Sequence, residues 1–121
     1  MGLIITNQGA VNFSAFETGA PGPYFRAATS NNVITANTWY NIVGTWDGTT
    51  GTNSVKVYVN NVSSGQDTPR SSSIESTIAP HIGNSGQGND EWYSGLIDQL
   101  RIFNKELSVS EINTLYNETR C

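Results

Sequence analysis

Residues 38–60 read TWYNIVGTWDGTTGTNSVKVYVN and decide the fold. Apolar and polar side chains alternate over most of this stretch, and the apolar positions are mainly β-branched or aromatic. Alternation of period two predicts two half-buried β-strands, over Thr38–Asp47 and Asn53–Asn60. The glycine-containing loop 48–52 joins them as a hairpin. One face of this hairpin carries Tyr40, Ile42, Trp46, Val55, Val57 and Val59, and the other carries Lys56 and Tyr58.

Further strands are predicted on both sides of this hairpin. Val11–Phe16 alternates, and Tyr24–Ala28 follows a Pro-Gly-Pro turn. Apart from these, the first 35 residues are weakly patterned. Thr77–Gly83 reads as a short strand, with Pro80 at an edge or a bulge. Residues 63–76 are rich in turn formers and are predicted to form a loop.

The end of the chain combines a predicted long strand with a predicted helix. Tyr93–Phe103 is the strand, with Asp98 on the same side as the apolar Leu96, Leu100 and Ile102. Ser108 and Glu111 then form a capping box, in which each residue accepts from a free backbone N–H of the other. The helix that follows is expected to bury its apolar stripe on the sheets, because so short a helix is marginal alone. That stripe consists of Ile112, Leu115 and Tyr116.

Composition narrows the class of protein. The 121 residues suffice for one domain, 1–121, with its own core. Charged residues make up 13%, while Ser, Thr and Asn together number 40, which argues against a helical bundle. A net charge of −4 with six scattered basic residues disfavours a nucleic-acid partner. No apolar run is long enough for membrane insertion. We therefore expect an all-β, antiparallel two-sheet sandwich with one short C-terminal helix.

Five segments, in order over residues 38–118, resemble the laminin-G-like domains of the concanavalin A-like lectin/glucanase superfamily. This resemblance implies a jelly-roll sandwich, and the C-terminal two-thirds carries it most clearly. The matching segments read WYNIVGTWDG (39–48), VKVYVNNV (55–62), HIGN (81–84), YSGLIDQLRIFN (93–104) and LSVSEINTLY (107–116).

Two departures from the family pattern stand out. The usual Asn-Gly turn is Asn60-Asn61, which is mild because Asn also adopts the left-handed conformation. The usual Asp-Glu pair is Asp98-Gln99, which removes one carboxylate. The family also places more strands ahead of the Trp39 strand than 37 residues supply. Either the sandwich is reduced or a neighbour completes it, so we expect a homo-oligomer or a larger assembly. The alternative is that residues 2–35 form compact strands that close the sandwich.

Catalysis is not expected. Sugar-cleaving jelly rolls place paired carboxylates on one strand, and no predicted strand has that spacing. Asp90 and Glu91 are adjacent and would point to opposite faces of a strand. His81 is the only histidine, and no sequence pattern marks an activated serine.

Calcium is the one metal to consider. The resemblance implies a Ca²⁺ held by the family's strand aspartate, here Asp98, with carbonyl groups of an early loop. The alternative is that Asp98 accepts backbone N–H bonds, or pairs with Arg101 or Arg26. The turn containing Asp90 is a second, weaker metal candidate, and its alternative is an ordinary solvated turn.

A ligand site is expected where exposed aromatic residues meet polar loops, since sugar rings stack on aromatic faces. Trp39, Trp92 and Tyr93 lie at strand ends, and Asn89 lies in the adjacent loop. We expect Trp92 to be exposed and Trp46 to belong to the core. The alternative for Trp92 is a rim residue that covers the helix.

Together these features predict a non-enzymatic module displayed on a surface for adhesion or carbohydrate recognition, with a glycan or a surface protein as partner. The alternative is a structural decoration or fibre subunit of a virus particle. No signal peptide is recognisable, and an extracellular or particle-surface location is favoured.

Overall fold

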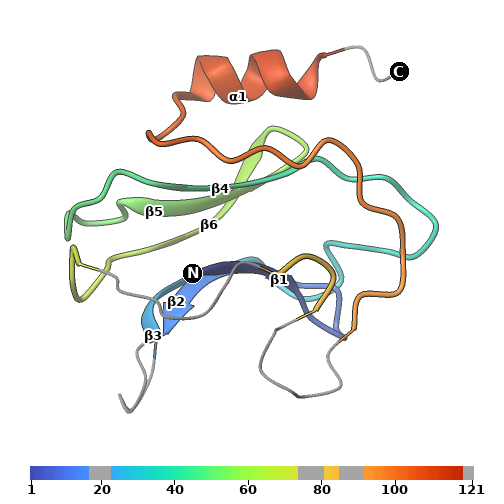
Figure 1. Ribbon diagram of the computed structural model, residues 1–121, viewed down its shortest axis with the longest axis horizontal. Coiled ribbons are helices and arrows are strands. Elements are labelled where there is room, and N and C mark those ends of the chain that lie inside the picture. The colour runs from blue at the N-terminus through green and yellow to red at the C-terminus, as the bar shows by residue number, and fades with distance from the viewer. Residues whose placement is uncertain (17–22, 74–80, 85–91, 119–121) are drawn as a thin grey trace.

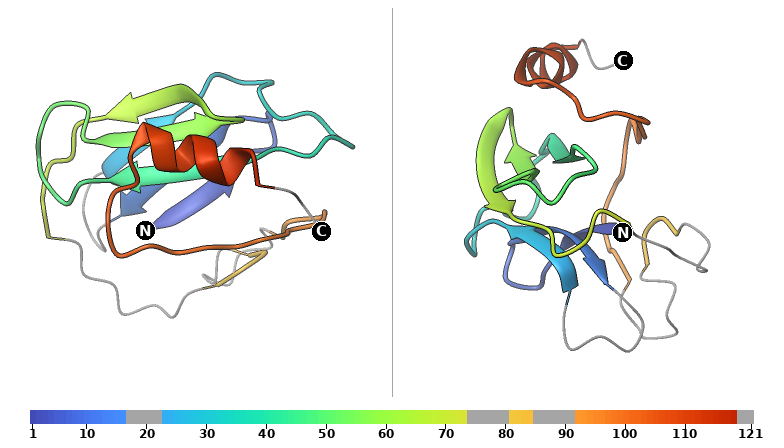
Figure 2. Two further views of the ribbon diagram at one scale, coloured as in Figure 1. Left: turned by 90° about the horizontal axis from the view of Figure 1, so that it is seen from above. Right: turned by 90° about the vertical axis from the view of Figure 1, so that its left-hand side faces the viewer.

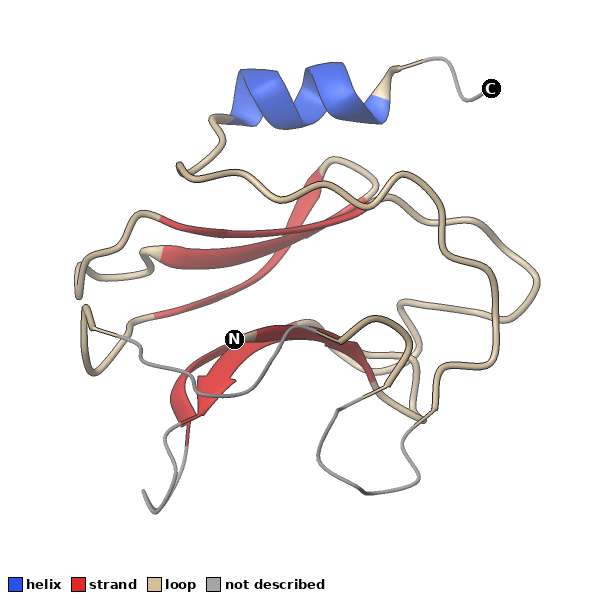
Figure 3. Cartoon of the chain, viewed as in Figure 1, coloured by secondary structure: helices blue, strands red, loops and turns tan. Residues whose placement is uncertain are grey.

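The computed structural model describes residues 1–16, 23–73, 81–84 and 92–118 (Figure 1). Two three-stranded antiparallel sheets face each other in this part of the chain, and a helix covers the outer face of the second sheet (Figures 1 and 3). The expected all-β sandwich with a short C-terminal helix is confirmed. The elements are β1 (Gly2–Ile5), β2 (Val11–Phe16), β3 (Pro23–Ala28), β4 (Ile42–Trp46), β5 (Val55–Val59), β6 (Val62–Asp67) and α1 (Val109–Tyr116).

The first sheet has the order β1-β2-β3. Strands β2 and β3 confirm the predictions for residues 11–16 and 24–28. Strand β1 was not predicted, because its residues GLII are apolar without alternation. The amino-terminal part therefore supplies a complete three-stranded sheet, which corrects the expectation of few strands there.

The second sheet has the order β4-β5-β6, and β4 and β5 form the predicted hairpin. The turn from β5 to β6 contains Asn60 and Asn61, both with positive φ (49° and 66°). Two consecutive left-handed residues are the signature of the tight hairpin turn that suits twisted strands. Strand β6 includes residues 63–67, which were predicted to begin a loop, and that prediction is wrong for these residues. Its sequence VSSGQD has no local strand signal, and pairing with β5 stabilises it.

The core lies between the two sheets. Phe25 is 1% exposed and packs against Phe13 of its own sheet and Trp46 of the other, with ring centroids 5.5 and 5.4 Å away. Trp46 is half-buried against this cluster, as expected. The remaining buried members are Val11, Ala15, Ala27, Val55, Val57 and Val59.

Helix α1 packs on the outer face of the second sheet. Ile112 is fully buried there with Tyr58 and Leu107, and Leu115 is half-buried beside them. Tyr116 is 38% exposed, so the expectation that it is buried is wrong. Both hydrogen bonds of the capping box predicted at Ser108 are present: the Ser108 side chain accepts the backbone N–H of Glu111, and the Glu111 side chain accepts the backbone N–H of Ser108.

The two sides of the sandwich differ. On one side, β6 reaches across to β3: Asp67 accepts a hydrogen bond from the backbone N–H of Arg26 (2.6 Å). Gly65 lies so close to β3 that an added Cβ would be 2.3 Å from the Ala28 carbonyl oxygen. On the other side, β1 and β4 are the edge strands, and no described strand pairs with either edge. The sandwich is therefore closed at β3 and β6 and open at β1 and β4.

Residues 92–105, called the outer segment below, run along this open side (Figure 2, left). The predicted strand Tyr93–Phe103 lies within it and is not a strand in the structure, where one isolated bridge joins Trp92 to Asn84. The sequence has the alternation of a strand, but a strand also needs a neighbouring edge for its hydrogen bonds. Neither of the free edges, at β1 and at β4, pairs with it. The predicted strand 77–83 lies mainly outside the described residues.

Candidate functional site

A groove of about 3090 Å³ opens between the edges of β1 and β4 and the outer segment. All residues of β1 and β4 line one wall, and residues 92–105 line the other. The groove thus lies on the open side of the sandwich.

Three of the four residues proposed as a ligand site line this groove. Trp92 is 70% exposed, as expected, and Trp39 and Tyr93 are exposed as well. Trp39 comes from the segment ahead of β4, and the other two begin the outer segment. The fourth residue, Asn89, lies outside the described residues.

Local backbone contacts position Trp92 and Tyr93. Trp92 bridges to Asn84, and the Tyr93 N–H donates to the Gly83 carbonyl (2.8 Å). Gly83 has a φ of +82°, a conformation that favours glycine. The Tyr93 ring lies over Gly95, where an added Cβ would be 2.8 Å from the ring and its hydroxyl. Glycine at residue 95 thus permits the observed position of the tyrosine.

Aliphatic side chains form much of the remaining lining. Ile102 is 86% exposed and Leu96 is 75% exposed. Large exposed apolar patches are unusual on monomeric proteins and are common at interaction sites. In the sequence, the alternation of apolar and polar residues in the outer segment was the available indication of these side chains. That alternation predicts a strand, but it does not show whether another strand pairs with it. The exposed aliphatic members of the lining also include Leu3, Ile4, Ile82, Ile97 and Leu100.

Asp98 lies in the outer segment and is exposed. One of its carboxylate oxygens accepts the backbone N–H of Gln99 (2.8 Å). Arg101, the partner considered for it, instead pairs with Glu118 at 2.6 Å, which raises the pKa of Arg101 and lowers that of Glu118. Asp98 therefore accepts a backbone N–H, as one of the alternatives to calcium predicted, and it does not pair with Arg101.

Asp98 belongs to no cluster of acidic or imidazole side chains in the described part of the chain. Ca²⁺ takes six to eight oxygen ligands. No group of three or more His, Cys, Asp or Glu side chains gathers within the described part of the chain. Asp90, the second metal candidate, lies outside that part. Calcium binding remains a prediction.

The described lining of the groove contains one imidazole, that of His81, and one carboxylate. Asp98 is the only carboxylate among the described lining residues. Glycosidic cleavage generally uses two carboxyl groups flanking the bond. The aromatic faces and the apolar surface of the lining are suited to binding.

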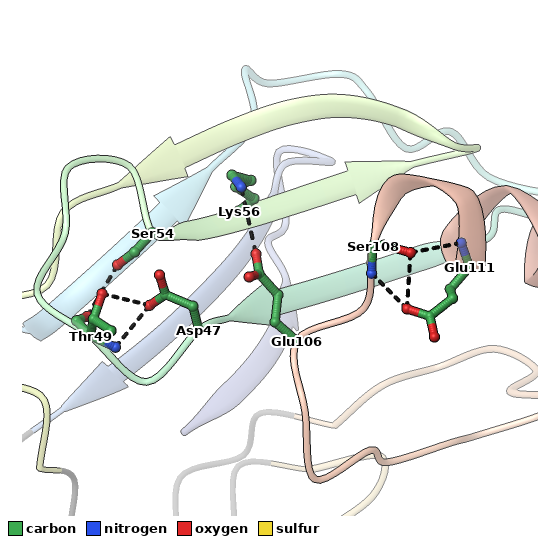
Figure 4. Close-up of polar contacts among 7 residues, drawn as sticks. All are labelled: Asp47, Thr49, Ser54, Lys56, Glu106, Ser108 and Glu111. Atoms are coloured by element: carbon green, nitrogen blue, oxygen red, sulfur yellow. Dashed lines mark hydrogen bonds and ion pairs between the residues drawn. The ribbon is translucent and has the colours of Figure 1, made fainter.

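Polar contacts outside the groove hold its walls in place (Figure 4). Asp47, at the end of β4, accepts from the N–H and the hydroxyl of Thr49, both at 2.8 Å. These bonds lower the pKa of Asp47, the backbone bond most. Lys56 of β5 pairs with Glu106 at 3.5 Å, which ties the end of the outer segment to the second sheet.

The capping box fixes the start of α1 beside this anchor. Glu111 accepts from the N–H of Ser108 (2.8 Å) and pairs with Lys105. These contacts, that with Lys105 first, lower the pKa of Glu111 to about 2. The outer segment is thus held at both ends, by Gly83 and Asn84 at one and by Lys56 and α1 at the other.

The family model of the concanavalin A-like lectin/glucanase superfamily matches residues 2–113. The chain belongs to this superfamily. The match includes the amino-terminal sheet, so the resemblance is not concentrated in the C-terminal two-thirds. A comparison with curated protein sequences gave no match.

One solved structure shares the superfamily fold with this chain. It is the crystal structure of residues 221–444 of an S-layer domain-containing protein from Clostridium thermocellum ATCC 27405, with a TM-score of 0.54 and 22% sequence identity. The alignment covers 90% of this chain and 52% of the solved one, so this chain spans about half its length. Within the described residues, no helix has the length and apolar character required to cross a bilayer.

Proposed function

We propose that this superfamily member is a non-enzymatic module, displayed on a surface, that recognises carbohydrate through the groove. The observation that carries the proposal is the exposure of Trp39, Trp92 and Tyr93 on one groove. Exposed aromatic faces are the surfaces on which sugar rings stack. A fold found in an S-layer domain-containing protein supports a location at a cell or particle surface.

A glycan array followed by titration of the strongest hit tests this proposal. Trp92→Ala should weaken binding by about tenfold or more, because a stacked ring loses its platform. Tyr116→Ala is the matched control: Tyr116 is also exposed but does not line the groove, so its loss should leave binding unchanged. Equal losses in both variants, or no glycan bound by the wild type, would contradict the proposal.

A second candidate function is a structural subunit of a larger surface assembly, such as a virus particle. The exposed aliphatic lining of the groove favours this second function, because leucine and isoleucine side chains cannot form hydrogen bonds with the hydroxyl groups of a sugar. Finding the chain in a fixed symmetric copy number in purified particles would support this role. If the chain is absent from such particles and a glycan ligand is confirmed, carbohydrate recognition remains the only candidate function.

A further inference from the structure

We infer that Glu111 and Glu118, two glutamates outside the groove, set the charge preference of the carbohydrate site. They neutralise the cations that line the groove, and the site therefore takes uncharged sugars rather than anionic ones. This inference rests on the proposed carbohydrate recognition and names the class of sugar. It is carried by the ion pairs of the outer segment and by the charges of the groove lining.

Two cations of the chain line the groove, and both have carboxylate partners. Arg101 and Lys105 are the only arginine and lysine among the described lining residues. Arg101 pairs with Glu118 at 2.6 Å and Lys105 pairs with Glu111. Hydrogen bonds from these cations lower the pKa values of both glutamates, so both stay ionised at neutral pH. An anionic sugar would have to compete with a glutamate for each cation.

The remaining formal charge of the described lining is negative. Asp98 carries this charge, and its carboxylate accepts the neutral Gln99 N–H. No cation among the described residues pairs with Asp98. His81 counts as neutral in the formal charge at pH 7. The described lining thus combines two neutralised cations with one carboxylate that repels anions.

The other cations of the chain do not change this balance. Lys56 pairs with Glu106 (Figure 4), and Arg26 and Arg70 have interaction partners as well. None of these three cations is among the described lining residues. Outside the described residues the sequence contains one further cation, Arg120, and a larger number of carboxylates. These carboxylates belong to Glu17, Glu75, Asp90 and Glu91.

Local charges, rather than the net charge of the chain, decide the preference of the site. In about 0.15 M salt, exposed charges more than about 8 Å apart are largely screened from each other. A carboxylate or sulfate group on a bound sugar would therefore respond mainly to Asp98 and to the two ion pairs. An arginine with no carboxylate partner would attract such a group, and the described lining offers none.

The lining does supply neutral groups that suit sugar hydroxyls. Exposed amide and hydroxyl side chains line the groove, among them Asn37, Thr38 and Ser94. Amides and hydroxyls both donate and accept hydrogen bonds, as sugar hydroxyls do. Hydrogen bonding to an uncharged sugar thus requires no free cation in the groove.

Matched pairs of glycans that differ in one acidic group test the inference. The probes are neutral glycans of an array and the same glycans carrying one sulfate or one sialic acid. They are titrated at about pH 8, where an ordinary histidine is uncharged. We expect the uncharged member of each bound pair to bind at least about tenfold more tightly than the acidic member.

Two variants with the same change in net charge test the role of the ion pairs. Glu118→Gln leaves Arg101 without its carboxylate partner and should raise the affinity ratio of acidic to neutral glycan by about fivefold or more. Glu106→Gln does the same to Lys56, which does not line the groove, and should leave this ratio unchanged. Glu118 is chosen instead of Glu111 because Glu111 also caps α1. Using the ratio corrects for any general change in the groove.

Three results would overturn the inference. The first is that the wild type prefers the acidic member of the pairs, in which case carbohydrate recognition stands with the opposite class of sugar. The second is that Glu118→Gln does not change the ratio, or that Glu106→Gln changes it equally. The third is that no glycan of the array binds, in which case the proposed function fails as well.

Discussion

Phe13 of the first sheet packs directly against the backbone of Gly44 in the second. A Cβ added at Gly44 would lie 2.6 Å from the Phe13 ring, a distance that real contacts do not show. The glycine of the IVGTW strand therefore sets how closely the two sheets approach, at the centre of the strand that borders the groove.

Gly44→Ala should destabilise the domain by about 1–3 kcal/mol, the usual cost of overpacking a core. Chemical denaturation measures the change. Gly2→Ala is the control, because its added Cβ would have no neighbour nearer than 3.9 Å, and its effect should stay within about 0.5 kcal/mol. If Gly44→Ala were as stable as the wild type, the two sheets would have moved apart to admit the added methyl group at no cost in the free energy of unfolding.

Ile112 and Leu115 should contribute unequally to docking of α1. Ile112 is fully buried and Leu115 is half-buried, so Ile112→Ala should cost about 2–5 kcal/mol and Leu115→Ala less. Val109→Ala, at an exposed position of the same helix, serves as the control in the same denaturation series. A larger loss at Leu115 than at Ile112 would contradict the observed orientation of the helix.

The helix cap should weaken in acid. The pKa of Glu111 is lowered to about 2 in the folded chain, and its ordinary value is 4.5. A depressed carboxyl pKa stabilises the fold above pH 4.5, and this contribution is lost progressively as the pH falls toward 2. Circular dichroism of the helix between these pH values should show the loss. Glu111→Gln should remove that part of the pH dependence, and an unchanged profile in this variant would exclude the cap as its source.

Calcium removal should leave the melting temperature unchanged. Asp98 belongs to no group of three or more described His, Cys, Asp or Glu side chains, and its carboxylate already accepts the Gln99 N–H. A thermal melt with and without a chelator is the measurement. If the chelator lowers the melting temperature and Asp98→Asn abolishes that response, Asp98 holds the ion after all.

The local parts of the fold were predictable from the sequence. The β4–β5 hairpin has alternation and a glycine loop, and the Ser108–Glu111 box marks the start of α1. Both depend on residues close together in the chain, so a short window contains the whole signal. The exposed Trp92 was predictable in the same way, from its place at the end of a patterned stretch.

The strands β1 and β6 were not predictable, for opposite reasons. Strand β1 is apolar without alternation, and β6 is polar with a glycine at its centre. Each forms because a stronger strand beside it offers an edge. Gly65 in β6 is required by the approach to Ala28, a contact between residues 37 apart in the chain.

The sequence by itself determined the superfamily, the sandwich, the docked helix and the aromatic residues available for a ligand. Only the tertiary structure decided that Trp39, Trp92 and Tyr93 share one groove, and that residues 95–103 face it without a ladder. The physical reason is that side-chain periodicity is local, whereas a β-strand also needs a neighbouring edge for its main-chain hydrogen bonds. The position of that edge depends on how the two sheets pack.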